Sequence, residues 1–436
     1  MSFLGTRNAV AIGVSQHLTL GGPDLLSKLS PSLILQFAGA QTMDPRITFT
    51  RSTTATFTGS NGLLQTAAIN TPRFDYDPVT LAPLGLLIEE QRANLLTYSE
   101  QFDNAAWAKT NATITANTIV APDGALTGDK LVSSSTTNFM SVNQLNVSVI
   151  SGNSYTMTAY AKVGEWRYAY LQVGGTSWTS QGQNSGIRFD LINGTVAGAY
   201  NGQSTANGSI SNEGNGWFRI SAVWTCNLTT AAGAVVIGMT NTNNTAASTG
   251  DGTSGIFIWG AQLEAGAFPT SYIPTVASQV TRAADVAVMT GTNFSDWYNQ
   301  TEGTLFAEGD AGGGTLPCFA SIDDGTTGNR IQLRRSVNDT QSGLRMVSPG
   351  GSIDVTLISG TATSVNKQAA SFSAGDQNAA ANGALFTGIT SIPTMPTVTR
   401  MDIGAGIGST ILNGYIRKIA YYPRRLSNAA LQGITS

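Results

Sequence analysis

One segment, Pro45–Leu96, decides how the chain can be divided. It reads PRITFTRSTTATFTGSNGLLQTAAINTPRFDYDPVTLAPLGLLIEEQRANLL. Its early run of β-branched and aromatic residues at 47–51 favours a strand. Gly59–Gly62 follows as a turn signal, because Asn-Gly adopts positive φ at low cost. The segment therefore predicts short strands joined by tight turns.

Arginines and carboxylates are interspersed along the same segment. The arginine fork suits bidentate pairing with carboxylates at buried or interface sites. Two interpretations stay open: the pairs fix loops within one chain, or they bridge the subunits of an oligomer. The residues concerned include Glu89 and Glu90, and the candidate oligomer or attachment contacts are Arg51, Arg73, Asp75, Asp77 and Arg92.

The composition of the whole chain favours an all-β protein. Only 11% of the 436 residues are charged, against about 25% in an average globular chain. Long surface helices need Lys and Glu, whereas 49 glycines and many Ser, Thr and Asn suit short strands and turns. The length indicates two or three domains.

Several classes of function and location are disfavoured by the sequence. The net charge of −3 and the lack of a basic run argue against nucleic-acid binding. The sequence contains no uninterrupted apolar stretch of about 20 residues, so no membrane-spanning segment is expected. The first residues lack the apolar core of a secretory signal, so we expect synthesis in the cytoplasm. Cys226 and Cys318 lie far apart and are expected to be separate buried thiols.

Period-two runs of apolar residues predict two β-sandwiches. The first contains runs at 155–163, 217–224 and 255–264, and the second opens near Phe294 and ends in a short capped helix after Ser427. We divide the chain into an arm (1–45), a connecting module (46–96), the first sandwich (97–275), a linker (276–290) and the second sandwich (291–436). Pro269 and Pro274 stiffen the connection just before the linker. The arm either anchors the chain to a partner or packs on its own domain.

No catalytic, metal or cofactor site can be assembled from the sequence. The single histidine, His17, lies in the arm, which disfavours a catalytic triad or a zinc site. The loops at Asp251 and Asp323-Asp324 offer calcium ligands but also read as ordinary turns. A glycosidase needs two carboxylates across a cleft, and nothing in the sequence pairs the acidic residues. We therefore expect a protein that is not an enzyme.

Sugar binding would use aromatic rings in polar loops, with amides and carboxylates for the hydroxyls. Trp178 lies in the polar loop that begins at Gly174, and Trp166 and Tyr168 follow Gly164-Glu165. These three residues are the candidate glycan contacts. Packing in the core or between subunits is the competing interpretation for each of them.

The segment Pro45–Leu96 resembles a module of tailed-phage and gene-transfer-agent virion proteins, namely head spikes, head fibres and tail fibres. Further stretches are similar to the same proteins: Asn94–Trp107, and Gly266–Asp285 with its FPTSYIPT and TRAAD phrases. The first sandwich resembles jelly-roll carbohydrate-binding modules, with IWGAQLE as its last strand. The second resembles concanavalin-A-like and laminin-G-like domains, through the ending GYIRKIAYYPRRLSNAAL.

The resemblance implies a structural protein on the surface of a virion, made in the bacterial cytoplasm and assembled as a homo-oligomer, by expectation a trimer. Its implied partners are capsid, neck or tail proteins and a host surface polysaccharide. Two alternatives remain: a decoration, neck or connector protein without glycan affinity, and a hydrolase that degrades capsule.

Overall fold

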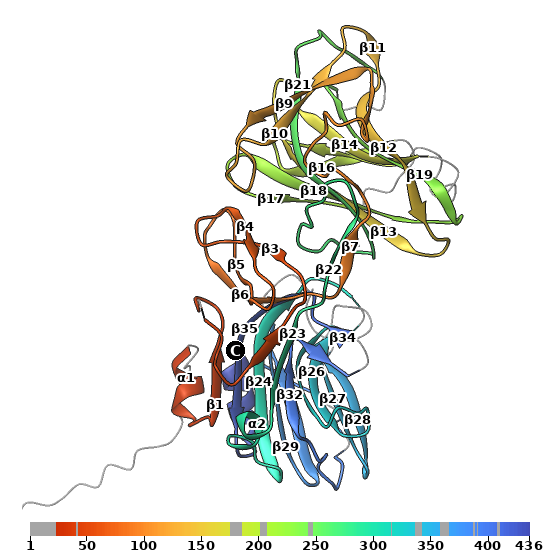
Figure 1. Ribbon diagram of the computed structural model, residues 1–436. Coiled ribbons are helices and arrows are strands. Elements are labelled where there is room, and N and C mark those ends of the chain that lie inside the picture. The colour runs from red at the N-terminus through yellow and green to blue at the C-terminus, as the bar shows by residue number, and fades with distance from the viewer. Residues whose placement is uncertain are drawn as a thin grey trace, which may run out of the picture.

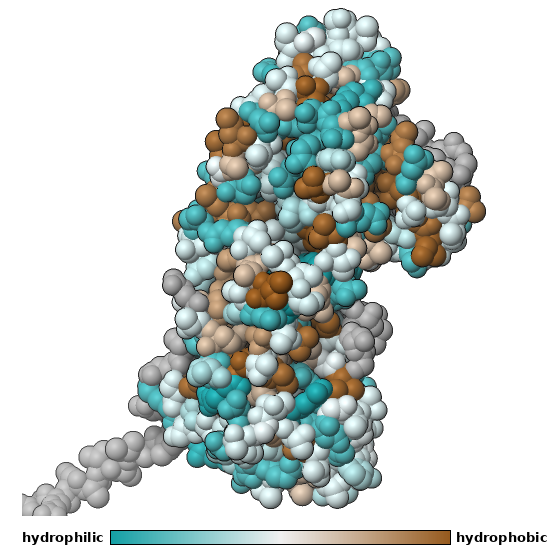
Figure 2. Space-filling model, viewed as in Figure 1, coloured by the Kyte–Doolittle hydropathy of each residue, from teal (hydrophilic) through white to brown (hydrophobic). Residues whose placement is uncertain are grey.

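The computed structural model describes residues 23–40, 42–174, 185–200, 207–242, 247–314, 316–335, 342–357, 366–386, 389, 391–407 and 410–436. Two β-sandwiches, which we name the middle sandwich and the C-terminal sandwich, lie end to end (Figure 1). Strands far outnumber helices among these residues, and the prediction of an all-β protein is confirmed. Figure 2 shows apolar residues scattered in small groups over one face of the molecule.

The middle sandwich consists of two antiparallel six-stranded sheets. The order in the first sheet is β17 (Gly208–Asn212), β18 (Trp217–Thr225), β13 (Ser154–Lys162), β21 (Gly255–Ala265), β10 (Gly128–Ser133) and β9 (Ala112–Ile119). The order in the second is β16 (Thr195–Tyr200), β15 (Gly186–Asp190), β14 (Tyr168–Gly174), β19 (Thr230–Thr240), β12 (Met140–Val149) and β8 (Ala108–Thr110). β11 (Thr137–Asn138) and β20 (Ser248–Thr249) form a small extra pair.

Alternation along each strand decides which side chains fill this core. In β18, Ile220, Ala222 and Trp224 are buried between the sheets, whereas Arg219 and Ser221 face outward. Trp217 and Trp259, expected to be buried, are each 1% exposed. They pack in a satellite cluster with Tyr160 on the outer side of the sheet.

The C-terminal sandwich has an eight-stranded and a seven-stranded sheet. The first runs β31 (Ala384–Leu385), β30 (Asp376–Ala381), β29 (Asn366–Ser373), β24 (Glu302–Ala311), β35 (Gly414–Tyr422), β6 (Pro83–Ile88) and β5 (Phe74–Tyr76), with β1 (Leu33–Gln36) also on β35. The second runs β2 (Thr48–Thr50), β23 (Val286–Thr290), β32 (Arg400–Ile403), β25 (Cys318–Asp323), β26 (Arg330–Arg335), β27 (Ser342–Ser348) and β28 (Gly351–Leu357). β33 (Ala405–Gly406) pairs with β34 (Thr410–Ile411).

Three short helices accompany the described strands. α1 (Pro23–Lys28) and α3 (Asn428–Thr435) cover the outer face of the eight-stranded sheet, and α2 (Thr292–Ser295) follows β23. The expected cap of α3 is present, because Ser427 Oγ accepts a hydrogen bond from Ala430 N at 3.3 Å. The side chains of α1 and α3 shield Phe306 and Tyr422, which lie on that outer face.

Strands from the N-terminal quarter of the chain belong to the C-terminal sandwich. The expected division treated residues 1–45, 46–96 and 276–290 as an arm, a module and a linker outside that sandwich. β1 pairs with one half of the outer edge of β35 and β6 with the other half. Residues 276–290, expected to be a linker, form β22 (Val280–Arg282), which pairs with β7 (Arg92–Asn94), and β23, which pairs with β2 and β32. The expected anchoring arm is described only from residue 23, and His17 lies outside the described residues.

The hairpin of β3 (Ala55–Thr58) and β4 (Leu64–Ala67) lies between the two sandwiches (Figure 1). Its turn was predicted from Gly59–Gly62, and Gly62 adopts a positive φ of 74° there. Cys226 is buried in the middle sandwich and Cys318 in the C-terminal one, as the sequence led us to expect. Among the described residues, no helix has the length and apolar character needed to cross a bilayer.

Candidate functional site

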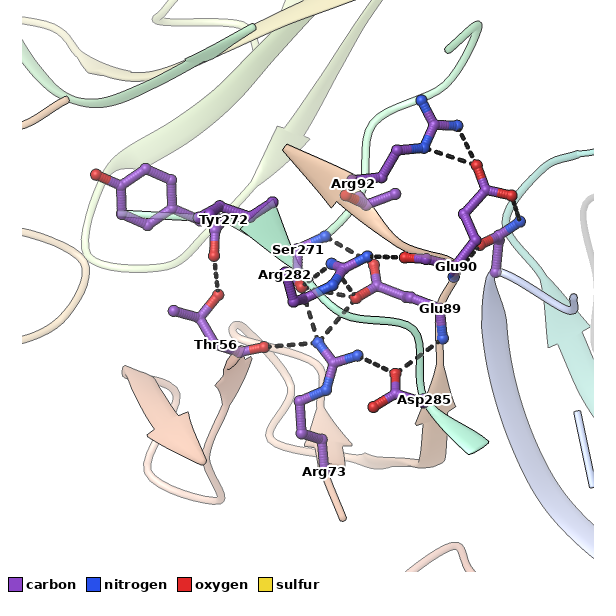
Figure 3. A network of polar contacts seen from close by, with 12 residues as sticks. Thr56, Arg73, Glu89, Glu90, Arg92, Ser271, Tyr272, Arg282 and Asp285 are labelled. Atoms are coloured by element: carbon purple, nitrogen blue, oxygen red, sulfur yellow. Dashed lines mark hydrogen bonds and ion pairs between the residues drawn. The ribbon is translucent and has the colours of Figure 1, made fainter. Parts of the chain in front are cut away.

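A buried network of arginines and carboxylates lies where the two sandwiches meet (Figure 3). Glu89 follows β6, and its Oε2 accepts from Arg73 Nη1 at 2.8 Å and from Arg282 Nη1 at 2.6 Å. Asp285 binds Arg73 Nη2 through one oxygen and Arg51 Nη1 through the other, the latter at 2.9 Å. The network thus joins residues that are about two hundred positions apart in the sequence.

Three guanidinium groups face two carboxylates in this network, and backbone carbonyls and Ser271 Oγ accept further N–H groups, whereas the Nε atoms of Arg73 and Arg282 are buried without a hydrogen-bond partner. Arg51 donates to the carbonyls of Thr53, Ala68 and Thr71, and Arg282 Nη2 donates to that of Glu90. Such bonds matter because an unpaired charge in a buried site is strongly unfavourable. The contacts hold the loops of the connecting module around a common centre.

Electrostatics favour the ionised form of Glu89. Burial alone would raise the pKa of this carboxyl, but Arg282, Arg73 and two hydrogen bonds from Ser271 lower it to about 2. The pKa of Arg73 is raised despite burial, because Glu89 and Asp285 stabilise its charge. Burial lowers the pKa of Arg51 and of Arg282.

A second set of contacts ties the connector after β21 to the middle sandwich. Glu264 accepts from Thr270 N at 2.9 Å and from Thr270 Oγ1 at 2.6 Å. Asn94 Nδ2 donates to Ala261 O and Ile273 O, at 3.0 and 2.9 Å. The GAQLE, FPTSYIPT and TRAAD stretches quoted from the sequence therefore supply one continuous junction.

The candidate contact residues of the connecting module all have partners within the chain. Arg51 and Arg73 are fully buried, and Arg92 Nε donates to Glu90 Oε1 at 2.7 Å. Asp77 caps a turn by accepting from Val79 N and Thr80 N. These contacts fix loops within one chain, and bridging between subunits stays a prediction.

Ser271, Arg282 and Asp285 are site residues that the sequence analysis did not single out. All three lie in Gly266–Asp285, the stretch that resembles virion proteins. The chemistry of the connecting module gave one indication of them. Its arginines and carboxylates stand among apolar residues, and buried charges need oppositely charged or hydrogen-bonding partners, some of which must come from other parts of the chain. The sequence could not identify those partners, because their distance along the chain is so large.

A cavity of about 330 Å³ opens beside this network. Its walls come from four places: the connecting module, the outer face of the middle sandwich, the connector after β21 (269–272), and the ends of β24 and β35. Asp75 lies in one wall and accepts from Thr58 N at 2.5 Å and from Tyr415 Oη at 2.9 Å. Glu213 lies in another wall and accepts from Ser211 Oγ at 2.6 Å.

Both carboxyls in these walls hold their protons more strongly than usual. Burial raises the pKa of Asp75 to about 6, against the opposing effect of its hydrogen bonds with Tyr415 and Thr58. Burial likewise raises the pKa of Glu213, although Ser211 and Arg219 oppose the shift. Perturbed carboxyls in a cavity are typical of functional sites.

The expected glycan contacts require a correction. Trp166 and Tyr168 are 5% and 8% exposed, so neither presents a ring face to a ligand. Gly164 explains the burial, because its lack of a Cβ lets the chain approach Gly255 O and turns Trp166 into the core. Trp178 lies outside the described residues.

The loops considered for calcium are ordered by their own hydrogen bonds. Asp251 accepts from the backbone N–H groups of Thr253 and Ser254, and Asp324 from that of Thr326. Within the described ranges, no cluster of three or more His, Cys, Asp or Glu side chains has a geometry that would hold a metal ion.

No protein-family model and no curated protein sequence matches this chain. Among solved structures, the Ruminococcus gnavus IT-sialidase CBM40 bound to alpha2,3 sialyllactose is similar with a TM-score of 0.27 and 16% identity, over 32% of this chain and 84% of that chain. Trypanosoma rangeli sialidase in complex with the inhibitor DANA gives a TM-score of 0.29 and 9% identity, over 71% of this chain and 60% of that chain. Likenesses this distant carry no argument about the ligand.

Proposed function

We propose that this chain is a structural appendage of a tailed phage or phage-like particle, a fibre or spike that attaches the particle to polysaccharide on the host surface. One observation carries the proposal. The stretches that resemble virion proteins, Pro45–Leu96 and Gly266–Asp285, lie far apart in the sequence and yet supply a single buried junction.

The junction suits an appendage mechanically. Its ion pairs have side-chain exposures of 0 to 6%, so solvent screens them weakly. Strands on both sides continue into the sandwiches, which makes the connection between them stiff. A stiff connection would hold the middle sandwich away from the part of the chain that meets the particle.

The particle assignment is tested on purified particles from an induced bacterial culture. Mass spectrometry of the particles and immunogold labelling should find the chain on their surface, and light scattering of the purified protein should give the mass of a homo-oligomer, by expectation a trimer. Absence of the chain from intact particles would refute the assignment.

Attachment is tested separately, with the purified oligomer and intact host cells. Saturable binding that disappears when the surface polysaccharide is stripped would support glycan recognition. A correctly assembled oligomer that fails to bind would favour a decoration, neck or connector protein instead.

A hydrolase that cleaves the same polysaccharide is the second candidate, because Asp75 and Glu213 line one cavity and glycosidases use paired carboxyls. Release of reducing ends from the polysaccharide by the wild-type protein, abolished in Glu213→Gln, would establish it. Binding without release of reducing ends would favour the attachment role.

A further inference from the structure

One wall of the junction cavity is an ordered block of side chains on the outer face of the middle sandwich. Antiparallel pairing places Ser209, Ser221 and Thr158 in one row across β17, β18 and β13. The next row contains Ser211, Arg219 and Tyr160. Six side chains from three strands thus present hydroxyl groups, one guanidinium and one ring to the cavity.

Arg219 is held firmly in this block but keeps unused hydrogen-bonding capacity. Its Nη2 donates to Thr158 Oγ1 at 3.2 Å and to Thr270 O at 2.7 Å, and its guanidinium lies 5.7 Å from the centre of the Tyr160 ring. Its Nε is buried and has no hydrogen-bond partner. A buried donor without a partner is unfavourable unless a ligand or water satisfies it.

The opposite walls add acceptors and apolar surface. Asp75 and Asp310 contribute carboxylates, and Glu213 stands beside Ser211. Half-buried Phe57 and Tyr76 also line the cavity, so parts of their rings are accessible. A volume of about 330 Å³ falls at the small end of the range of about 300 to 1,000 Å³ for small-molecule sites, which often form at domain interfaces.

We propose that this cavity binds one end or one short stretch of a neutral, hydroxyl-rich saccharide. The inference rests on the proposed attachment function and names its site. Serine, threonine and carboxylate oxygens would accept from sugar hydroxyls, Arg219 would donate to them, and the ring of Tyr76 or Phe57 would pack against the apolar face of a sugar ring.

The charges select against acidic sugars. Three carboxyl groups line the cavity, those of Asp75, Glu213 and Asp310, and one guanidinium group, that of Arg219, lies opposite them in charge. Glu89 also reaches the wall, but Arg73 and Arg282 neutralise it. A sialic or uronic acid would bring a further negative charge against this surplus, whereas a neutral sugar meets only hydrogen-bonding groups.

The test uses the full-length oligomer and oligosaccharides cut from the host polysaccharide, separated by anion exchange into neutral and acidic fractions. Calorimetry should show binding to the neutral fraction. Glu213→Gln and Tyr76→Ala should each raise the Kd about tenfold or more, the loss expected for one hydrogen bond to a charged group or one ring contact.

Matched controls come from outside the cavity. Glu165→Gln changes a glutamate that pairs with Lys130 at the surface, and Phe139→Ala removes a ring that is 44% exposed on the middle sandwich. Both variants should bind as the wild type does. Circular dichroism of all four variants verifies that the fold is retained.

The outcomes separate this inference from the function on which it rests. If the wild type binds stripped and unstripped cells alike or not at all, the attachment function fails, and the site falls with it. If the wild type attaches to polysaccharide but prefers the acidic fraction, or if Glu213→Gln and Tyr76→Ala bind as tightly as their controls, the cavity is not the site, while attachment stands.

Discussion

Arg73 joins the two carboxylates at the centre of the junction. Its Nη1 also donates to Thr56 O at 3.0 Å, so a single side chain connects a hairpin, a sheet and the connector. Removing one member of a buried ion pair leaves the others uncompensated, which is far more destabilising than breaking a surface pair.

Arg73→Met should therefore lower the free energy of unfolding by about 3 to 5 kcal/mol. Arg46→Met is the matched control, because Arg46 pairs with Asp44 and its side chain is 36% exposed. The control should lose less than about 1 kcal/mol. Chemical denaturation measures both, and equal losses would contradict a dominant role for the buried network.

Asp75 gives the fold a pH dependence of opposite sign to that of Glu89. Its pKa of about 6 exceeds the ordinary value of 3.8, so its stabilising contribution is complete below 3.8 and is lost as the pH rises through 6. Glu89, whose pKa is lowered to about 2, contributes above 4.5 and loses that contribution as the pH falls toward 2.

The variant Asp75→Asn isolates the first effect. Between pH 4.5 and 7.5, the stability of the wild type relative to this variant should fall by about 2 kcal/mol, since one pKa unit corresponds to about 1.4 kcal/mol. All other titrating groups are shared and cancel in the comparison. Denaturation of both proteins across this range measures the difference, and a constant difference would show that Asp75 titrates normally.

At the scale of elements, β6 is fitted to the edge of β35 by one glycine. Gly85 has a φ of 120°, and a Cβ built on it would lie 2.2 Å from Ile416 O. No other residue can occupy this position without moving one backbone away from the other. The contact fixes the path of the chain just before Glu89, and hence the position of the network.

Gly85→Ala should lower the free energy of unfolding by more than about 2 kcal/mol, through backbone strain and loss of the β6–β35 pairing together. Gly152→Ala separates the two causes, because Gly152 also has a positive φ, of 84°, but no atom lies within 4 Å of its Cβ position. This control should lose only about 1 kcal/mol. Equal losses in thermal unfolding would show that strain alone is responsible.

Strands could be predicted from the sequence where their pattern is local, but their pairing over long distances in the chain could not. The alternation in 217–224 and 155–163 is local, so the strands and their inward faces could be predicted from it. The pairing of β6 with β35 joins residues more than three hundred positions apart, and nothing local encodes it. The prediction of Trp166 as an exposed glycan contact was wrong because a polar, glycine-bearing turn resembles a surface loop in the sequence. In the structure, Gly164 lets the Trp166 ring reach the core.

At the scale of the whole molecule, the two sandwiches differ in how much of their core comes from one continuous segment of the chain. The core of the middle sandwich consists of residues between Leu96 and Leu263. The core of the C-terminal sandwich includes Leu33, Leu35, Phe74, Leu86, Ile88 and Met289, which all precede residue 291. Only the middle sandwich therefore has a complete core within the boundaries that the sequence suggests.

This asymmetry predicts opposite behaviour of two fragments. Residues 95–266 should fold alone and unfold cooperatively, because both of their sheets and their core are present. Residues 291–436 should not fold, because each missing large apolar side chain removes about 1.5 to 3 kcal/mol of burial. The six together remove about as much as the roughly 5 to 15 kcal/mol that stabilises a domain. Adding residues 23–96 in trans should restore part of the structure. Dispersed NMR spectra distinguish these cases, and a folded 291–436 fragment would show that the N-terminal strands merely decorate a sandwich that is complete without them.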